Sequence, residues 1–503
     1  MSSTSAGKYY ITTSIAYVNA GPHVGYAMEL LQADVLARYQ RLCGAETYFL
    51  TGTDEHGLKI AQVAEAAHLA PIELADKNSA LFRDLASAMG VSHDDFVRTT
   101  EDRHVAYVLE MWKKLVAAGD IYKADYEGLY CVGCERYYLE KELSEGKCPI
   151  HLKAPVAVKE ANYFFRLSRY ADQIREKITS GEVAIWPIAR RNEILSFMEE
   201  GLNDVSFSRP KEQVKWGIPV PGDEDQLMYV WCDALTNYLS VIDREKYWPA
   251  DVQVIGKDIL RFHAVYWIGM LLSAGFALPK AIMVHGFITS DGVKMSKSLG
   301  NVKDPFEYIE KYGRDALRYF LLREIPTLGD GDFSQARFDI VYKDELANTF
   351  GNLVSRVLAM AGKYFGGAVP TPGVDDGFAA KVAAVWADYD SSVREYDLKK
   401  ALEFVVALGY AANKYVEDTK PWALAKTDNA RLAEVIYNLL ELVRVLGVML
   451  LPFIPDSAAK VLGVFQEGFA VNGFVWSDAR VYGVLKEGTK LGELAVMFPR
   501  VEG

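Results

Sequence analysis

Residues 9–35 read YYITTSIAYVNAGPHVGYAMELLQADV, and this stretch decides the class of fold. Its first part, residues 9–14, is rich in β-branched and aromatic side chains, which is typical of a buried strand. Residues 24–42 follow with the periodicity of an amphipathic helix. A strand that leads within a few residues into such a helix predicts a parallel α/β sheet. The apolar positions on one face of the helix are Val24, Met28, Leu31 and Val35.

His23 stands between the predicted strand and the predicted helix, at the helix N-terminus. Free backbone N–H groups and the positive end of the helix dipole favour phosphate at such a place, and an imidazole adds a hydrogen-bond donor. A Pro-His pair before a helix is more often a cap or a packed turn. This segment alone therefore does not establish a phosphate site.

The alternation of strand and helix patterns continues through residues 1–116, with another strand at residues 47–50. A stretch rich in Cys, Gly and charged residues then interrupts it, and we assign residues 117–226 to an insertion. Residues 227–290 complete the sheet. The strand patterns that resume after the insertion are at residues 227–231, 252–255 and 281–284.

Residues 344–503 have helical periodicity and few strand patterns, which predicts an all-α bundle. Asp397 before Leu398 is a helix start signal, and residues 366–377 are rich enough in Gly and Pro to form a loop. Prolines expected to stop helices stand at positions 421, 452 and 455.

The composition is that of an ordinary globular protein of several domains, with 503 residues, 50% of them apolar and 24% charged. A formal net charge of −12 excludes a basic coat for general nucleic-acid binding, so any RNA contact must be local. No apolar run approaches the roughly 20 residues of a membrane helix, and residues 1–8 lack the apolar core of a signal peptide. We expect a cytoplasmic protein without a membrane anchor.

Two short Cys and His pairs, separated by thirteen residues, have the spacing of a zinc site. Four such ligands predict one closed, tetrahedral structural Zn²⁺ that folds the insertion and does not catalyse. This clustering favours a reducing compartment over a disulfide framework. Cys43 and Cys232 have no partner in sequence, and we expect them to be buried thiols. The four predicted ligands are Cys131, Cys134, Cys148 and His151.

A second candidate phosphate-binding segment is KMSKS at residues 294–298, flanked by Asp-Gly and Gly-Asn pairs. Lys294 and Lys297 can hold a triphosphate as point charges on a loop. For a lysine pair alone, a solvated surface loop is the better interpretation. Here the pair shares one chain with HVGY at residues 23–26, at the separation of a split sheet, which favours the phosphate function.

These two segments together resemble the H-x-G-H and K-M-S-K-S signatures of the class I aminoacyl-tRNA synthetases. Tyr26 departs from the pattern, because histidine is usual there. No G-x-G-x-x-G or Walker A pattern follows the first strand, which argues against a dinucleotide enzyme and a P-loop ATPase. The resemblance implies a Rossmann-like catalytic domain, a KMSKS junction domain at residues 291–343 and an anticodon-binding helical domain at residues 344–503.

Further segments, distributed along nearly the whole chain, resemble the methionyl-tRNA synthetases. The zinc knuckle also resembles the single-knuckle insertion of some of these enzymes. The resemblance to this family implies ATP-dependent activation of L-methionine to methionyl-adenylate and its transfer to tRNA(Met), initiator tRNA included, with release of AMP and pyrophosphate. The segments are TSIAYVN at residues 13–19, GTDEHG at 52–57, YVWCDA at 229–234 and IGKDILRFH at 255–263.

The resemblance also implies the site residues. His23, Lys294 and Lys297 would be catalytic, and Asp54 would hold the methionine ammonium. An aromatic box suits the methionine side chain, and a Tyr hydroxyl or a His N–H can donate to its sulfur. Each aromatic taken alone is more often a core residue. ATP, bound with Mg²⁺, would contact Asn19, His23, Gly25, Tyr26, Glu29, Gly256, Lys294 and Lys297. The methionine pocket would comprise Ile15, Tyr17, Asp54, Trp231, Ala234, Tyr238, Ile259, Phe262 and His263.

In the helical domain, Asn352 and Arg356 lie one turn apart, and Trp422 follows Lys-Pro. From the residues alone, an ordinary polar helix edge and a tryptophan packed at a helix start are the simpler interpretations. The family places an Asn-x3-Arg pair and a Lys-Pro-Trp tryptophan at the anticodon. The resemblance therefore implies that these three residues bind the anticodon, partly by base stacking.

Other functions stay open at this point. The chain could be a class I synthetase for valine, isoleucine, leucine or cysteine, although its insertion is small for an editing domain and its predicted zinc is not at a substrate pocket. A nucleotidylyltransferase shares the sheet but has no need of the helical domain. A silent tRNA-binding paralogue is disfavoured by the intact KMSKS segment. With no further C-terminal module in the sequence, we expect a monomer.

Overall fold

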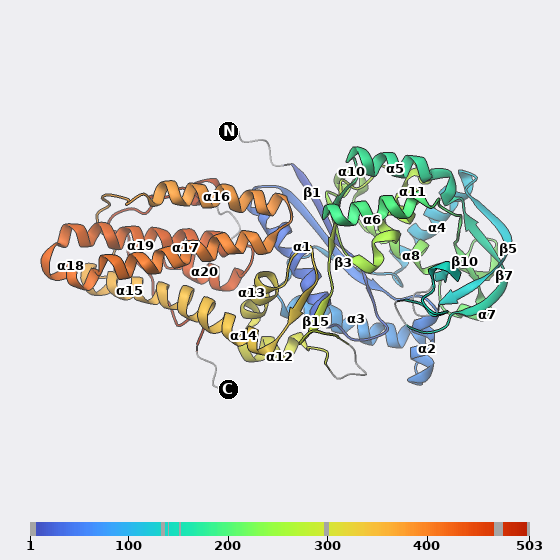
Figure 1. The fold of residues 1–503 in the computed structure, drawn as a ribbon, viewed down its shortest axis with the longest axis horizontal. Coiled ribbons are helices and arrows are strands. Elements are labelled where there is room, and N and C mark those ends of the chain that lie inside the picture. Colours follow the sequence, from blue (N-terminus) through green and yellow to red (C-terminus); the bar gives the residue numbers. More distant parts are fainter. Residues whose placement is uncertain are drawn as a thin grey trace.

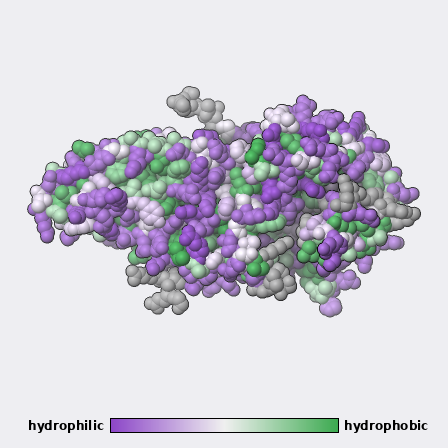
Figure 2. Space-filling model, in the orientation of Figure 1, coloured by the Kyte–Doolittle hydropathy of each residue, from purple (hydrophilic) through white to green (hydrophobic). Residues whose placement is uncertain are grey.

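The computed structural model describes residues 7–131, 136–138, 140–149, 152–295, 301–466 and 476–499. Figure 1 shows an elongated molecule with a sheet-bearing part at one end and a long helical part at the other. The face drawn in Figure 2 is largely hydrophilic, with apolar residues scattered over it. Among the described residues, no helix is both long enough and apolar enough to cross a membrane.

A seven-stranded sheet forms the core of the sheet-bearing part, in the order β2-β3-β1-β13-β14-β8 with β4 also paired to β3. All of its strand pairs are parallel. Because β1 pairs with β3 on one side and with β13 on the other, the two halves of the split sheet meet at β1. The predicted parallel sheet is confirmed. Its strands are β1 (Lys8–Thr13), β2 (Ala16–Tyr17), β3 (Glu46–Asp54), β4 (Asp95–Arg98), β8 (Ala184–Trp186), β13 (Val252–Gly256) and β14 (Ala281–His285).

The helix predicted after the first strand is α1, and it spans the predicted residues, Val24–Leu42. It is buried on more than the one face that the periodicity predicts, because it packs against β1, β3 and β13 and also against α13 (Arg314–Glu324). The other helices around the sheet are α2 (Leu58–Ala66), α3 (Pro71–Ala88), α4 (Asp102–Ala117), α5 (Ala171–Ser180), α6 (Ile188–Glu199) and α11 (Ile268–Ala274).

The prediction of a strand at residues 227–231 is wrong for the second half of that range. Strand β12 (Asp223–Met228) ends before it, and helix α8 (Val230–Leu235) carries Trp231. Short apolar runs have the same pattern in a strand and in a buried helix, which explains the error. Short helical segments that follow are α9 (Asn237–Ser240), α10 (Arg244–Tyr247), the 3-10 turn η3 (Lys257–Ile259) and the π-helix η4 (Phe262–Trp267).

The insertion predicted at residues 117–226 contains two small antiparallel sheets, β6-β5-β7-β9 and β10-β12-β11. They lie at the end of the molecule farthest from the helical part (Figure 1). One strand within this range, β8, instead pairs with β14 and extends the main sheet. The elements of the insertion are β5 (Ile121–Cys131), β6 (Arg136–Tyr138), η1 (Glu140–Glu142), β7 (Val156–Phe165), η2 (Leu167–Tyr170), β9 (Val205–Ser206), β10 (Ser208–Pro210), α7 (Lys211–Val214) and β11 (Pro219–Val220).

A three-stranded sheet, β16-β15-β17, follows the last strand of the main sheet along the chain. Asp291 and Gly292 turn from β15 into β16 with φ of 51° and 76°. An Asp-Gly pair suits two successive positive φ values. Lys294 therefore lies directly after a tight hairpin turn. The elements here are β15 (Ile288–Ser290), β16 (Val293–Lys294), α12 (Pro305–Tyr312), α13 (Arg314–Glu324) and β17 (Gly331–Phe333).

The helical part is the predicted bundle, and residues 366–377 form the predicted loop between α15 and α16. The Asp397 side chain accepts the backbone N–H of Lys400 at 3.0 Å, as the start signal predicts. Pro421 and Pro455, which were expected to stop helices, are each the first residue of the next helix. Its helices are α14 (Gln335–Val341), the π-helix η6 (Tyr342–Gly351), α15 (Asn352–Phe365), α16 (Phe378–Arg394), α17 (Leu398–Thr419), α18 (Pro421–Thr427), α19 (Asn429–Leu450), α20 (Pro455–Gly463) and α21 (Trp476–Ala479).

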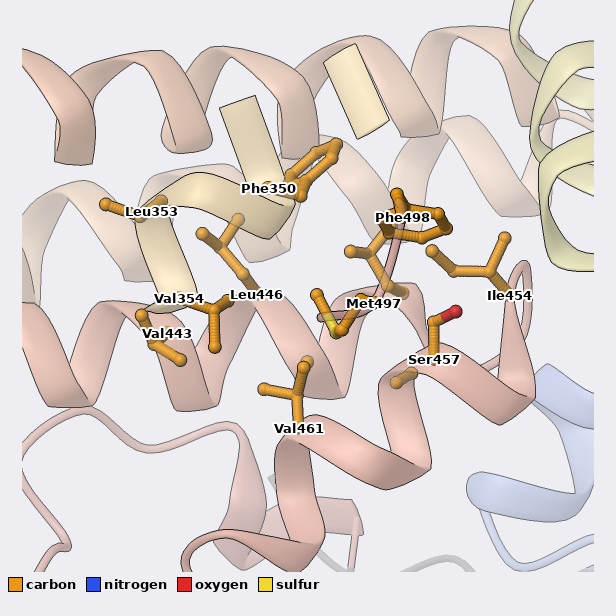
Figure 3. A pocket seen from close by; sticks show the side chains of 13 residues that line it. Phe350, Leu353, Val354, Val443, Leu446, Ile454, Ser457, Val461, Met497 and Phe498 are labelled. Carbon is orange, nitrogen blue, oxygen red and sulfur yellow. The ribbon is translucent and has the colours of Figure 1, made fainter. Parts of the chain in front are cut away.

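A cavity of about 20 Å³ lies inside this bundle, between η6, α15, α19, α20 and the C-terminal segment (Figure 3). Its lining is almost entirely apolar, so it offers no groups to bind ATP or an amino acid. Leu353 and Val354 point into it, which shows that this face of α15 packs inward. Asn352, their neighbour, is exposed.

Candidate active site

His23 is the N-cap of α1, and its side chain binds the first turn of that helix. Nδ1 accepts the backbone N–H of Gly25 at 3.0 Å. A neutral imidazole whose Nδ1 accepts carries its proton on Nε2. The capping role and a donor role toward phosphate thus belong to different nitrogens of one exposed ring.

Gly25 is required by this cap. A Cβ at this position would lie 2.8 Å from Cε1 and 2.9 Å from Nδ1 of His23. Real Cβ atoms do not approach ring atoms so closely, so any larger residue would push the imidazole away from the helix start. The capping position of the His23 ring therefore requires glycine at position 25.

Tyr26 is partly buried and packs against an apolar core. Its ring meets Phe82 of α3 edge-on, with centroids 4.9 Å apart, and its hydroxyl lies 3.4 Å from Thr51 Oγ1. Burial raises the pKa of this tyrosine far above its ordinary value. The described contacts are those of a packing residue, and a contact to ATP stays a prediction.

Glu29 forms a buried ion pair with His285, a residue outside all of the motifs in the sequence. His285 Nε2 lies 2.8 Å from Glu29 Oε2, and Ser14 donates to Oε1 of the same carboxylate at 2.6 Å. Burial alone would lower the pKa of His285, but the hydrogen bond and charge of Glu29 outweigh it and raise that pKa. Both carboxylate oxygens of Glu29 are engaged within the protein.

Gly256 ends β13 and leaves room for a neighbouring carboxylate. A Cβ there would lie 2.8 Å from Asp258 Oδ1 and 3.7 Å from the His285 ring. Asp54 ends β3, and Ser14 follows β1. Because β1, β3, β13 and β14 are parallel, these residues gather at one edge of the sheet, where open α/β sheets bind ligands.

The KMSKS segment lies partly outside the described residues. Lys297 is not among them, and of Lys294 only the backbone in β16 is described, paired with Thr289. Met295 packs against the same apolar core as Val24 at the start of α1. The meeting of both lysines with His23 therefore stays a prediction, although the start of the segment borders the core beneath that histidine.

The predicted methionine pocket has an aromatic stack at its centre. The rings of Trp231 and Phe262 are parallel, with centroids 3.8 Å apart and an interplanar angle of 5°. One apolar cluster unites them with other predicted pocket residues from separate parts of the chain. These are Tyr17, Tyr238 and Ile259.

The remaining predicted pocket residues differ in their surroundings. Ala234 is buried, and Asp54 is 8% exposed beside Tyr17, its register partner in the sheet. Ile15 packs against a different apolar cluster, which contains Leu50. The structure thus brings together most of the pocket side chains, and the place of Ile15 in the pocket stays a prediction.

The side chains expected to donate to the methionine sulfur, Tyr238 and His263, bind each other in this structure. His263 Nδ1 lies 3.0 Å from the Ile259 carbonyl and must donate to it. Burial lowers the pKa of His263 to about 4, so its ring is neutral near pH 7 and Nε2 is an acceptor. The Tyr238 hydroxyl, 2.7 Å away, therefore donates to Nε2. Both expected donors are engaged within the protein in this structure.

A buried carboxylate, Asp233, lies between two histidines. His56 Nδ1 and His104 Nε2 lie 2.7 Å and 2.8 Å from its two oxygens. Burial would raise the pKa of Asp233, but the two histidines lower it to about 2. These residues are far apart in sequence, so no local pattern could have predicted the group.

Two of the four predicted zinc ligands are described. Cys131, at the end of β5, and Cys148 are buried and pack in one small cluster with Tyr138. Within the described ranges, no three His, Cys, Asp or Glu side chains are arranged to hold a metal ion. Cys134 and His151 lie outside those ranges, so the site stays a prediction. Cys232 is buried as expected, whereas the expectation of burial was wrong for Cys43, which caps the exposed end of α1.

The predicted anticodon residues lie on the surface of the bundle. Asn352 and Arg356 project from α15, opposite its buried face, and Arg356 Nη2 forms an ion pair with Glu417 of α17 at 2.8 Å. Trp422 is 43% exposed at the start of α18. This exposure argues against the alternative of a tryptophan packed under the bundle at the helix start, and the anticodon contact stays a prediction.

Comparison with known proteins agrees with this architecture. The family described as tRNA synthetases class I (M) matches residues 9–155 and 139–358, and the anticodon binding domain of methionyl tRNA ligase matches residues 369–503. The methionine–tRNA ligase of Brucella suis is 46% identical over 472 residues, which cover 91% of each chain.

Solved structures give the same result. The Mycobacterium tuberculosis methionyl-tRNA synthetase in complex with methionyl-adenylate is 41% identical and superposes with a TM-score of 0.93, covering 98% of this chain and 100% of that one. Its apo form is 37% identical, with a TM-score of 0.86 and 99% of each chain covered. By its fold, its aromatic cluster and these comparisons, the chain belongs to the class I methionyl-tRNA synthetases.

Proposed function

We propose that this methionine–tRNA ligase activates L-methionine at the carboxyl edge of its main sheet and then transfers it to tRNA(Met). One observation carries the proposal. The Trp231–Phe262 stack and its apolar cluster include Tyr17, whose strand neighbour is Asp54 at the end of β3. An apolar pocket beside a carboxylate suits an amino acid with an apolar side chain and a positive ammonium group.

In the proposed activation step, a carboxylate oxygen of methionine attacks the α-phosphorus of MgATP, and the bond to pyrophosphate breaks. The Nε2–H of His23, together with Lys294 and Lys297, stabilises the charge on the phosphates. Mg²⁺ enters with ATP. Glu29 is also a proposed ATP contact, and in this structure its carboxylate holds His285 and Ser14 in place. The remaining proposed ATP contacts are Asn19, Gly25, Tyr26 and Gly256.

In the proposed methionine site, Asp54 accepts the ammonium and the aromatic stack buries the side chain. Because Tyr238 donates to His263 in this structure, a hydrogen bond to the sulfur requires the hydroxyl to turn toward the substrate. The other groups that we propose around methionine are Ile15, Tyr17, Trp231, Ala234, Ile259, Phe262 and His263.

In the proposed transfer step, a hydroxyl of the terminal ribose of tRNA attacks the adenylate carbonyl, and AMP leaves. We propose that Asn352, Arg356 and Trp422 bind the anticodon of elongator and initiator tRNA. The exposed indole supports base stacking. Glu417 holds the Arg356 guanidinium now, and a nucleotide would compete with it.

We also propose one structural Zn²⁺ at Cys131, Cys134, Cys148 and His151. Two buried thiols in one cluster, with the order and spacing of the motif, support it. Soft thiolate and imidazole donors fit zinc, and a site with four protein ligands has no open position for substrate. Its proposed role is to fold the end of the insertion.

The domain limits are proposals too: residues 1–116 and 227–290 for catalysis, 117–226 for the insertion, 291–343 for the junction and 344–503 for the bundle. Two observations qualify them. Strand β8 joins the catalytic sheet from within the insertion range, and α14, η6 and α15 run continuously across the limit at residue 344. A monomer and a cytoplasmic location complete the proposal.

The decisive experiment is ATP–pyrophosphate exchange with each of the twenty amino acids. We expect exchange with methionine alone. Exchange driven by another amino acid would overturn the substrate, and exchange with none would indicate a silent tRNA-binding paralogue. Aminoacylation of tRNA(Met) transcripts with elongator and initiator sequences then tests the transfer step.

A further inference from the structure

We infer that Asp233 is a positioning residue for methionine, which holds together the separate chain segments that form the amino-acid site. This inference rests on the proposed methionine site. Asp233 is 1% exposed, and each of its oxygens receives one hydrogen bond from a histidine. A buried carboxylate stays ionised only with such partners, so its geometry is tightly specified.

The hydrogen-bond directions follow from the charge of the carboxylate. An ionised carboxylate only accepts, so His56 carries a proton on Nδ1 and His104 carries one on Nε2. Neither histidine can turn away without leaving the buried charge with one partner fewer. The arrangement therefore resists displacement of any one of its members.

His56 connects Asp233 to the residue that we propose for the ammonium. It follows Asp54 by two positions in the turn after β3. Trp216 also holds this turn, since its Nε1 donates to the Glu55 carbonyl at 2.6 Å and its ring lies beside that of His56, with centroids 5.3 Å apart. The bond between His56 and Asp233 thus fixes this turn against α8.

Asp233 itself connects to the pocket wall, because α8 also carries Trp231 and Ala234. His104 extends the connection to α9. Its Nδ1 lies 2.8 Å from Ser240 Oγ, two positions after Tyr238. Helix α4 packs against both α8 and α9, so His104 joins these two short helices from behind.

The consequence is that one buried carboxylate sets the distance between the ammonium site and the aromatic pocket. That distance has to match the length of one amino acid. An error of about 1 Å at a reacting group costs up to ~100-fold in rate, so loss of a hydrogen bond to Asp233 should strongly reduce the rate of methionine activation.

His104 offers the cleanest test, because it is completely buried in α4 and lies behind the short helices that carry Trp231 and Tyr238. In ATP–pyrophosphate exchange, His104→Leu should raise the KM for methionine by ~10-fold or more and leave the KM for ATP within about 2-fold. The preference for methionine over norleucine, measured as a ratio of kcat/KM, should change as well. His104→Gln keeps a donor near Nε2 and should restore most of both properties.

Val108→Ala is the matched control. Val108 is equally buried one turn along α4 and makes no bond to Asp233. It should lower the thermal midpoint but leave the KM for methionine unchanged. An unchanged KM in His104→Leu, or an equal rise in Val108→Ala, would overturn the inference. Failure of the wild type to exchange with methionine would instead overturn the proposed function.

Discussion

Arg318 Nη2 lies 2.7 Å from Asp34 Oδ2, and both side chains are completely buried where the catalytic sheet meets the helical part. Asp34 belongs to α1, the helix that His23 caps, and Arg318 belongs to α13. The guanidinium also donates to the carbonyls of Phe453, Pro452 and Met89. One side chain therefore ties the catalytic helix to the loop that precedes α20 in the bundle.

Removal of this arginine should destabilise the whole chain. Arg318→Met leaves the Asp34 charge and several carbonyls buried with fewer partners, which typically costs about 3–5 kcal/mol. We expect a clear fall in the midpoint of thermal unfolding. Arg337→Met is the control, because its ion pair with Glu324 lies near the surface and contributes at most ~1 kcal/mol. Equal midpoints for the two variants would contradict this role for Arg318.

Asp34 should make stability depend on acid pH. Burial would raise its pKa, but Arg318 and Arg38 lower it from 3.8 to about 2 in the folded protein. A carboxyl whose pKa is lower when folded stabilises above its unfolded pKa, and this contribution is lost between about pH 4 and pH 2. The size is roughly 2 kcal/mol. In Asp34→Asn, the fall of the unfolding midpoint over this range should be shallower than in the wild type. An identical slope would show that Asp34 does not carry the effect.

The two nitrogens of His23 can be tested separately. Asparagine is a good N-cap but lacks a donor at the Nε2 position. We expect His23→Asn to keep its thermal midpoint and to lose ~100-fold in kcat of pyrophosphate exchange, by analogy with removal of one donor to a developing charge. Full activity in this variant would mean that the imidazole only caps α1.

Gly25→Ala should also slow the activation step, because it displaces the His23 imidazole. Its Cβ would lie within 3 Å of the imidazole, so the ring must move while helix α1 is otherwise retained. We expect a fall in kcat of at least ~10-fold, smaller than for His23→Asn, with little change in the KM for methionine. If kcat stayed at the wild-type value, the position of the ring would not matter.

Trp422 should affect charging and not activation. Stacking of a base on an exposed aromatic is worth about 1–3 kcal/mol. Trp422→Ala should therefore raise the KM for tRNA(Met) in aminoacylation by ~5- to 150-fold and leave pyrophosphate exchange intact. Tyr410→Ala, at another exposed aromatic of the same bundle, is the comparison. Normal charging by the Trp422 variant would refute the anticodon assignment.

The sequence predicted the features that depend on neighbouring residues, namely single strands, helices, loops and helix caps. Strand β1 and helix α1 follow the pattern of residues 9–35, the loop at residues 366–377 follows its Gly and Pro content, and Asp397 caps the helix that it precedes. The pocket aromatics followed from resemblance, and most of them share one cluster. Each of these features is set by residues close in sequence or by a long motif.

Only the tertiary structure decided which distant groups meet. It placed Trp231 on a helix where a strand was expected, and it joined β8 to a sheet from within the insertion. It also engaged Tyr238 with His263, and it built the buried groups around Asp233 and Asp34. The physical reason is that a buried charge needs partners. The chain supplies these partners from segments that are far apart in sequence, so the sequence contains no periodic pattern that would reveal them.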